Sequence, residues 1–386
     1  MKKVALAVNY DYHDYGGMLQ AFATQQALDK MGVESEVINF DALKGDINKR
    51  KWIYFLKNIT DLSIVKEKGK VIEKRLRTKW NSGLKEQHEL RNAAFDRFCE
   101  SGFKVSKRFE DWGELSGNCF NYDAVMVGSD QLWLPSNIAG DYYTLNFVPE
   151  KVRKIAYATS FGISVIPEKM REQYVAYLRR IEFLSARETT GQDIIKQCTG
   201  REVPLVCDPT LLLQTTDWEK VASDRNVPNE DYVFCYFMGD NPEQREFVKR
   251  LAKKEKLKIV ALLHLDQYIP SDEDYVDFAP YDVTPADFVG LVKNAKFVCT
   301  DSFHGTVFSI IFSRNFFTFK RFNKKASLST NTRLESLLNR LNLTDRLFMG
   351  QEKLDNRIYI KDYESIQKRV EEFRQTSKDY IVESLN

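Results

Sequence analysis

The residues best suited to chemistry stand at positions 300–306, where Thr-Asp-Ser-Phe-His-Gly-Thr follows a short apolar run. Histidine is scarce, with four in the 386 residues, and His304 falls where a strand is expected to give way to a helix. A histidine placed there can act as a general acid or base, or stabilise an oxyanion beside the helix N-terminus. His264 also ends an apolar run and is a weaker candidate for the same site. The ordinary alternative for both is a histidine hydrogen-bonded within a turn.

Arginines offer a way to hold an anion. Arg187 directly follows the apolar run Phe183–Ala186, and its guanidinium could grip a carboxylate or phosphate with two parallel hydrogen bonds. A structural ion pair with Glu188 or Asp208 is the alternative. Arg333 is a further cation that could bind the anion. The alternative is that it only forms an ion pair on the surface of a helix.

Two polar segments carry groups that suit a sugar or an anion. Residues 128–133, Gly-Ser-Asp-Gln-Leu-Trp, follow the run Ala124–Val127 and combine hydrogen-bonding side chains with an aromatic face. The loop Asn9–Gly17 ends in two glycines, which let backbone N–H groups approach an anion. The alternatives are a buried turn in which Asp130 caps backbone amides, and an ordinary tight turn.

Alternating apolar and amphipathic segments must position these groups, and that alternation predicts parallel sheets with right-handed crossovers. The expected strands are Val4–Val8, Val37–Phe40, Ala124–Val127, Lys154–Thr159, Phe183–Ala186, Val203–Cys207, Tyr232–Phe237, Lys258–Leu263, Phe297–Thr300 and Phe316–Phe319. The expected helices are Met18–Lys30, Pro167–Ile181, Thr189–Cys198, Pro242–Lys254, Pro285–Lys293, a short one after Gly305, Thr332–Leu341 and a tail, Asp362–Leu385, that could pack on either domain. In open parallel sheets ligands bind beyond the carboxyl ends of the strands, where the candidate residues stand.

We therefore expect an α/β protein with two Rossmann-like domains and a site in the cleft between them. The N-terminal domain is placed at 1–210, with a basic helical insertion at about 44–110, and the C-terminal domain at 211–386. The insertion could rest on an anionic membrane, or it could simply be a solvated helix face.

Composition limits the function classes. Hydrophobic residues at 43% and charged residues at 29% argue against disorder, and 57 basic against 55 acidic residues argue against a nucleic-acid-binding surface. The six cysteines are scattered, which argues against a disulfide framework or a zinc site. No apolar run approaches the length of a spanning helix. We expect a cytoplasmic protein that could contact the inner face of a membrane. We also expect that it needs no metal or cofactor.

Five short segments together resemble the polysaccharide pyruvyl transferase family, in family order and across most of the chain. They are residues 15–21 (Tyr-Gly-Gly-Met-Leu-Gln-Ala), 128–133, 185–188 (Ser-Ala-Arg-Glu), 208–212 (Asp-Pro-Thr-Leu-Leu) and 301–305 (Asp-Ser-Phe-His-Gly). The resemblance implies a glycosyltransferase-B-like pair of domains. It also implies transfer of the enolpyruvyl carbons of phosphoenolpyruvate onto a sugar as a pyruvate ketal, with release of phosphate. The sugar acceptor could be lipid-linked or nucleotide-linked.

The resemblance also assigns roles to residues. Arg187 and His304 match the arginine and histidine that serve the phosphoenolpyruvate site in characterised members. Some members carry an arginine where this chain has Ser302, so one expected anion contact is missing and Lys320, Arg321 or Arg333 would have to replace it. The expected donor-binding residues are Ser302, Gly305, Thr306 and Arg333. The expected acceptor-binding residues are Asp11, Tyr15, Gly16, Gly17, Ser129, Asp130, Gln131 and Trp133.

Two other functions stay open at this stage. One is a glycosyltransferase that uses a nucleotide sugar in the same cleft. The other is a non-catalytic, sugar-binding protein of a polysaccharide assembly system, which the missing arginine keeps in view.

Overall fold

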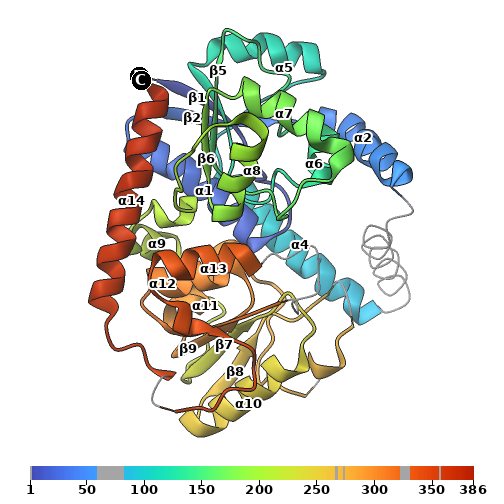
Figure 1. The fold of residues 1–386 in the computed structure, drawn as a ribbon. Coiled ribbons are helices and arrows are strands. Elements are labelled where there is room, and N and C mark those ends of the chain that lie inside the picture. Colours follow the sequence, from blue (N-terminus) through green and yellow to red (C-terminus); the bar gives the residue numbers. More distant parts are fainter. Residues whose placement is uncertain (1, 59–81, 266–267, 273, 322–330, 356–357) are drawn as a thin grey trace.

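The computed structural model describes residues 2–58, 82–265, 268–272, 274–321, 331–355 and 358–386, and these form two parallel sheets surrounded by helices (Figure 1). The strand order is β3-β2-β1-β4-β5-β6 in the first sheet and β11-β10-β9-β7-β8 in the second. Every pairing in both sheets is parallel. The expected α/β class with two Rossmann-like units is confirmed. The two sheets with their helices are called the N-terminal half and the C-terminal half below; a domain boundary near residue 210 stays a prediction.

The N-terminal half is built on apolar strands covered by helices on both faces. Its strands are β1 (Lys3–Ala7), β2 (Glu34–Asn39), β3 (Val105–Arg108), β4 (Ala124–Val127), β5 (Arg153–Thr159) and β6 (Phe183–Ala186). Its helices are α1 (Tyr15–Lys30), α2 (Lys44–Lys57), α4 (Ser82–Gly102), α5 (Trp112–Asn118), α6 (Pro135–Gly140), α7 (Arg171–Arg180) and α8 (Thr189–Thr199). Helix α9 (Thr215–Val221) follows and contacts the C-terminal half, where the Thr215 hydroxyl donates to the Ile311 carbonyl at 2.9 Å. All four residues of β4 are buried, as expected for a central strand of a parallel sheet.

The strand expected at Val203–Cys207 is not formed. The segment runs beside β6 but pairs with it at a single bridge, between Ala186 and Leu205. Pro204 has no N–H to continue the ladder, which accounts for the difference.

The C-terminal half repeats the alternation. Its strands are β7 (Tyr232–Tyr236), β8 (Lys258–Ala261), β9 (Phe297–Thr300), β10 (Asn315–Phe319) and β11 (Leu347–Phe348). Its helices are α10 (Pro242–Glu255), α11 (Pro285–Asn294), α12 (Phe303–Ile311), α13 (Asn331–Arg340) and α14 (Tyr363–Leu385). Helix α12 was expected to start after Gly305 but begins at Phe303, because the Ser302 side chain caps it by accepting from the Gly305 N–H.

Two long helices tie the halves together. Helix α14 runs along both of them in Figure 1: Tyr363 donates to the carbonyl of Arg314, and Tyr380 donates to that of Ala156 at 3.0 Å. The tail therefore packs on both halves rather than on one. Helix α4 belongs to the expected basic insertion, whose middle, residues 59–81, lies outside the described residues.

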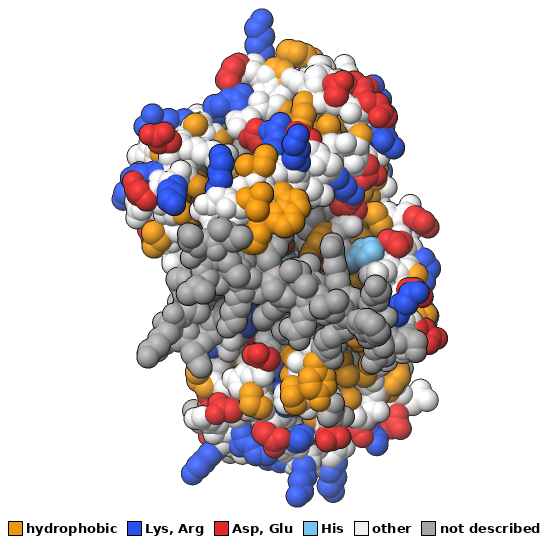
Figure 2. Space-filling view, turned by 90° about the vertical axis from the view of Figure 1, so that its right-hand side faces the viewer, with side chains coloured by type: hydrophobic (Ala, Val, Ile, Leu, Met, Phe, Trp, Pro, Cys, Tyr) orange, Lys and Arg blue, Asp and Glu red, His pale blue; other side chains and the backbone are white. Residues whose placement is uncertain are grey.

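The surface agrees with the near-zero net charge. On the face shown in Figure 2, basic and acidic side chains are interspersed over both halves. Among the described residues, no helix combines the length and the apolar character needed to cross a bilayer.

Candidate functional site

The two halves meet at His304, in the first turn of α12. Its Nε2 lies 3.5 Å from Oδ2 of Asp208, which belongs to the N-terminal half, and has no partner in hydrogen-bond geometry. Its ring packs on Gly16 in the first turn of α1 so closely that a β-carbon at position 16 would overlap it. Glycine at position 16 is therefore what allows the histidine to enter from the other half.

Arg187 lies next to this contact, at the carboxyl end of β6. Its Nη1 donates to Asp208 Oδ2 at 2.6 Å, and its Nη2 lies 3.4 Å from Asp130 Oδ1. Burial opposes the charge, but Asp208 and Asp130 outweigh it and raise the pKa of Arg187, so the guanidinium stays charged. Its buried Nε lies 3.9 Å from Glu188 Oε2 and makes no hydrogen bond in the structure.

Arg333 reaches the same place from α13. Its Nη1 lies 3.7 Å from Asp130 Oδ1, and its guanidinium lies 5.8 Å from the Phe303 ring, on which Arg187 also rests at 4.6 Å. The residue is 7% exposed, and burial and the charge of Arg187 lower its pKa to about 10. The interpretation as a helix-surface ion pair is wrong. Two arginines share one carboxylate here, and Nε of Arg333 also has no partner, so the cluster has cationic donors to spare.

The carboxylates of the cluster differ in their protonation. Burial would raise the pKa of Asp208, but His304 and Arg187 outweigh it and hold that pKa far below its usual range. The pKa of Asp130 is lowered in the same way, mainly by Arg187 against burial. Asp14 behaves oppositely, because burial and the charge of Asp130 raise its pKa. Burial also raises the pKa of Glu188, which lies beside Arg187, so Asp14 and Glu188 are the two carboxyl groups of this cluster suited to take and release a proton.

The sequence reasoning missed Asp14. Its side chain caps α1 by accepting from the Gly17 N–H at 2.6 Å, and its charge interacts with those of His304 and Asp130. The available signal was an aspartate one residue before the Tyr-Gly-Gly segment, at an N-cap position. Asp11, the aspartate of this loop that was expected to bind the acceptor, is paired with Lys44.

Two aromatic side chains expected to bind the acceptor belong to the packed interior. Trp133 is 0% exposed, and its Nε1 donates to the Tyr143 carbonyl at 3.0 Å, so its ring offers no face to a sugar. Tyr15 is buried against Phe288 and donates to the Val283 carbonyl at 3.2 Å. Both predictions are wrong, because these two large rings pack in the hydrophobic core and are not exposed to a ligand.

The turn after His304 makes hydrogen bonds of its own. The Thr306 Oγ1 pairs with Thr318 Oγ1 at 2.8 Å, and its N–H donates to the Ser302 carbonyl at 3.1 Å. The Gly305 N–H points to Ser302 Oγ at 3.4 Å, and a β-carbon there would lie 2.6 Å from Thr300 Oγ1. The N–H groups of Gly305 and Thr306 are thus engaged at the start of α12, whereas the Ser302 hydroxyl accepts there and keeps its own O–H. Anion binding by these three residues stays a prediction.

The remaining predicted residues lie around the cluster in different roles. Ser129 is buried, donates to the Ala158 carbonyl at 2.9 Å and lies 3.3 Å from Arg187 Nη1, so it positions the arginine. Gly17 lies beside Asp14, and the side chain of Gln131 packs against Gly162. The structure thus brings together His304, Arg187, Arg333, Asp130 and Gly16 from the sequence prediction and adds Asp208 and Asp14.

The other cations considered as replacements lie at the edge of this cluster. Lys320 pairs with Glu335 at 2.9 Å. Arg321 donates to the Asp301 carbonyl at 3.1 Å, and its charge acts on Asp14 and Arg333. Among the described residues no group of three or more histidine, cysteine or acidic side chains is arranged to hold a metal ion.

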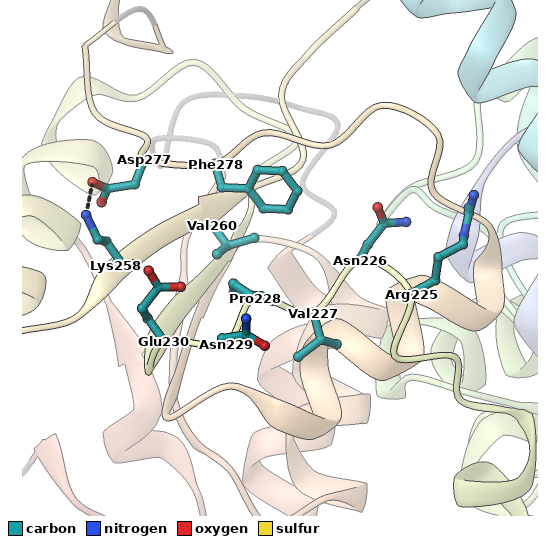
Figure 3. A pocket seen from close by; sticks show the side chains of 10 residues that line it. All are labelled: Arg225, Asn226, Val227, Pro228, Asn229, Glu230, Lys258, Val260, Asp277 and Phe278. Atoms are coloured by element: carbon teal, nitrogen blue, oxygen red, sulfur yellow. Dashed lines mark hydrogen bonds and ion pairs between the residues drawn. The ribbon is translucent and has the colours of Figure 1, made fainter.

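A pocket of about 470 Å³ lies elsewhere, in the C-terminal half (Figure 3). Lys258 and Asp277 pair with each other in its wall at 3.3 Å, and Arg225 is paired with Asp282 and Asp287. Glu230 and Lys258 stand at the amino ends of β7 and β8, opposite to the ends that lead to His304. Both of its cations are thus paired with carboxylates, and the pocket is separate from the site described above.

Residues 14–321 match the family model described as polysaccharide pyruvyl transferase. This chain belongs to the polysaccharide pyruvyl transferase family. The match runs from Asp14 to Arg321, so it includes the Gly16–His304 contact, Arg187 and both buried aspartates, and it stops before Arg333. Membership makes the chain an enzyme of polysaccharide biosynthesis. Among curated protein sequences, none matches this chain significantly.

Solved structures resemble this chain over nearly its full length at low identity. The UDP-GlcNAc 2-epimerase from Neisseria meningitidis bound to UDP-GlcNAc is 11% identical with a TM-score of 0.47, over 100% of this chain and 99% of that one. The UDP-GlcNAc 2-epimerase from Methanocaldococcus jannaschii is 12% identical with a TM-score of 0.48, over 96% and 92%. The ADP-heptose lipopolysaccharide heptosyltransferase II of E. coli is 10% identical with a TM-score of 0.38, over 98% and 100%.

Proposed function

We propose that this protein transfers the enolpyruvyl carbons of phosphoenolpyruvate onto a sugar, forms a pyruvate ketal and releases phosphate. The observation that supports this beyond family membership is the buried cluster in which His304, Arg187 and Arg333 surround two ionised aspartates. A small dianion or trianion suits such a site, because it satisfies several cationic donors at once.

Donor binding falls to the two arginines. Phosphoenolpyruvate carries a carboxylate and a phosphate, and Arg187 and Arg333 each keep a buried Nε–H that makes no hydrogen bond. Arg333 supplies the cation that Ser302 does not, from a different part of the chain. Asp208 holds Arg187 in place and keeps its guanidinium charged.

The chemistry begins with His304. A protonated imidazole gives its proton to the methylene carbon of phosphoenolpyruvate, which makes the central carbon electrophilic. One sugar hydroxyl adds to that carbon and loses its proton to the Asp14 carboxylate. The bond from the central carbon to the phosphate oxygen then breaks, and phosphate leaves with the electron pair and takes the proton from Asp14. The second hydroxyl adds to the central carbon and its proton goes to the imidazole of His304, which restores both groups. Asp130 orients the hydroxyls.

The test is titration of phosphoenolpyruvate into the protein by calorimetry, together with a phosphate-release assay with sugar acceptors. Binding that weakens markedly in His304→Ala and Arg187→Lys, both folded by circular dichroism, is the expected result. Tight binding of a nucleotide sugar without any binding of phosphoenolpyruvate would overturn the proposal in favour of a glycosyltransferase. Binding of sugar alone, with no turnover, would favour the non-catalytic role.

The proposal includes a cytoplasmic location and an acceptor on a lipid or nucleotide carrier. Peripheral contact between the basic insertion and a membrane stays a prediction.

A further inference from the structure

A second group of side chains with unpartnered nitrogen atoms lies where α4 bridges the two halves. On one side the ring of His13, in the loop before α1, contacts Asn92 and Asp96 of α4 at 3.0 and 2.8 Å. On the other side Arg91 Nη1 donates to the Leu263 carbonyl at 2.8 Å. Helix α4 is thereby fixed against the segment that follows β8, and that segment carries His264.

His264 is held in one orientation by a buried ion pair. Its Nδ1 lies 2.9 Å from Asp272 Oδ2, and the other oxygen of that carboxylate accepts from Arg245 Nε at 2.8 Å. Burial raises the pKa of Asp272, but His264 and Arg245 outweigh it and lower the pKa, so the carboxylate is ionised and Nδ1 must be the donor. Arg245 is itself 1% exposed and rests on the Phe237 ring at 4.8 Å. The imidazole is therefore fixed with its Nε2 edge turned away from Asp272.

Several polar atoms in this group have no partner. They are Nε2 of His264, Nη2 of Arg245, and both Nε and Nη2 of Arg91. A buried donor without an acceptor costs about 1–3 kcal/mol, and native proteins rarely leave several together. The carboxylate nearby, Asp272, is already occupied on both oxygens. The arginine nitrogens of the group can only donate, and Nε2 of His264 donates as well when the imidazole is protonated. An anion with several oxygens, such as a phosphate, would supply the acceptors that these donors lack.

The position fits the second substrate of the proposed reaction. The strand order β9-β7-β8 places the segment of His264 two strands from that of His304, about 10 Å at the usual spacing of strands. The charge of Arg91 acts on Tyr236, at the end of β7, as do those of Asp14 and Arg321 at the His304 cluster. The charges of both groups therefore act on the same residue, Tyr236, at the end of the strand that lies between them.

We infer that Arg91 and His264 form a second anion subsite that binds the phosphate or diphosphate through which the acceptor sugar is linked to its carrier. Calling the ligand an acceptor rests on the proposed function, whereas anion binding at these residues does not. Asp272 and Arg245 are positioning residues, because they act through His264.

The inference is tested with inorganic pyrophosphate as the probe, in calorimetric titrations of the full chain. Two isosteric variants separate the ring nitrogens: His264→Asn keeps a donor for Asp272 and loses Nε2, while His264→Gln keeps a donor near the Nε2 position. We expect binding at least 10-fold weaker in His264→Asn and in Arg91→Lys, and near the wild-type level in His264→Gln. Arg97→Gln, on the same helix with its partner Asp282 in the C-terminal half, is the control that leaves binding unchanged.

His304→Ala separates this subsite from the donor site. Pyrophosphate binding that persists in His304→Ala and falls in His264→Asn supports the inference. Binding that is lost in His304→Ala but unchanged in His264→Asn and Arg91→Lys overturns it, as does the absence of any binding to the wild-type protein. Phosphoenolpyruvate binding, measured separately, should be unchanged in His264→Asn. If phosphoenolpyruvate fails to bind at all, the proposed function fails while the subsite is still judged by pyrophosphate.

The carrier is identified by two further titrations. Uridine diphosphate binding more tightly than pyrophosphate, and losing that affinity in His264→Asn, assigns a nucleoside diphosphate. The same behaviour with farnesyl diphosphate assigns a lipid-linked diphosphate. Either result supports the subsite, and failure of both compounds to compete with pyrophosphate overturns its role as the acceptor site.

Discussion

The imidazole of His304 occupies the space into which a β-carbon at Gly16 would project, so the first turns of α1 and α12 are in direct contact. These helices belong to different sheets. Their contact brings the histidine of one half to the aspartates of the other, and the candidate site exists only because residue 16 has no side chain.

Gly16→Ala should therefore lower the activity far more than it lowers the stability of the fold. The added methyl group displaces the His304 ring, and a shift of about 1 Å at a catalytic group costs on the order of 100-fold in kcat. Gly45→Ala in α2 is the matched control, since nothing lies within 4 Å of its β-carbon position, and it should keep full activity. Phosphate release and thermal unfolding are measured for both variants. Wild-type activity in Gly16→Ala would show that the ring is not required where the structure places it.

Arg333→Lys tests whether this arginine replaces the missing one. A lysine keeps the charge but loses the forked donors, and a charge-assisted hydrogen bond is worth about 1.5–3 kcal/mol. The KM for phosphoenolpyruvate should rise about 10- to 100-fold, with a smaller change in kcat. Arg340→Lys, exposed at the end of the same helix, should change neither constant. An unchanged KM in Arg333→Lys would assign the anion to Arg187 alone.

Asp208→Asn should be destabilising in a pH-dependent way. The folded-state pKa of Asp208 lies below the value of about 3.9 in an unfolded chain, so its contribution to stability is present above that pH and is lost as the pH falls. At pH 7 the variant leaves Arg187 without its main partner, which costs about 3–5 kcal/mol. The difference in unfolding free energy between wild type and variant should shrink as the pH falls below about 4. Denaturant unfolding at pH 7 and pH 3 measures it, and an equal difference at both would contradict the assigned pKa shift.

The sheets could be predicted from the sequence because their strands are short, continuous apolar runs. Ala124–Val127, Phe183–Ala186 and Phe297–Thr300 were predicted to the residue. Prediction failed at Val203–Cys207, where the apolar pattern is present but Pro204 limits the pairing to one bridge. An apolar run predicts that a segment is buried, but it does not predict that the segment pairs as a strand. Here the missing N–H of Pro204 prevents further pairing.

The site was predicted only in part, because sequence shows which residues follow strands but not which way they face. His304, Arg187 and Arg333 were found as scarce or bidentate groups at such positions. Trp133 has a ring of the kind that stacks on sugars, but it is packed in the interior. Its ring contacts Phe161, and its N–H donates to a backbone carbonyl. The pairing of Asp208 with Arg187 was visible in the sequence only as an alternative, because α8 lies between the two residues and the sequence does not specify how the chain returns after it.

Asp14 and Asp11 provide a matched pair for the proposed base, three residues apart in one loop. Asn is as good an N-cap as Asp, so Asp14→Asn should keep the α1 cap and fold normally, while a positioned base typically contributes 10²- to 10⁴-fold to the rate. We expect that loss in Asp14→Asn and near-normal activity in Asp11→Asn, whose carboxylate is paired with Lys44. The pKa of Asp14 is raised, mainly by burial, and a base works only when deprotonated. Wild-type kcat should therefore rise with pH through an acidic limb that lies above the ordinary aspartate pKa of about 3.9, and that limb should be missing from the residual activity of Asp14→Asn. A pH–rate profile with the same acidic limb in both proteins would assign the base to another group.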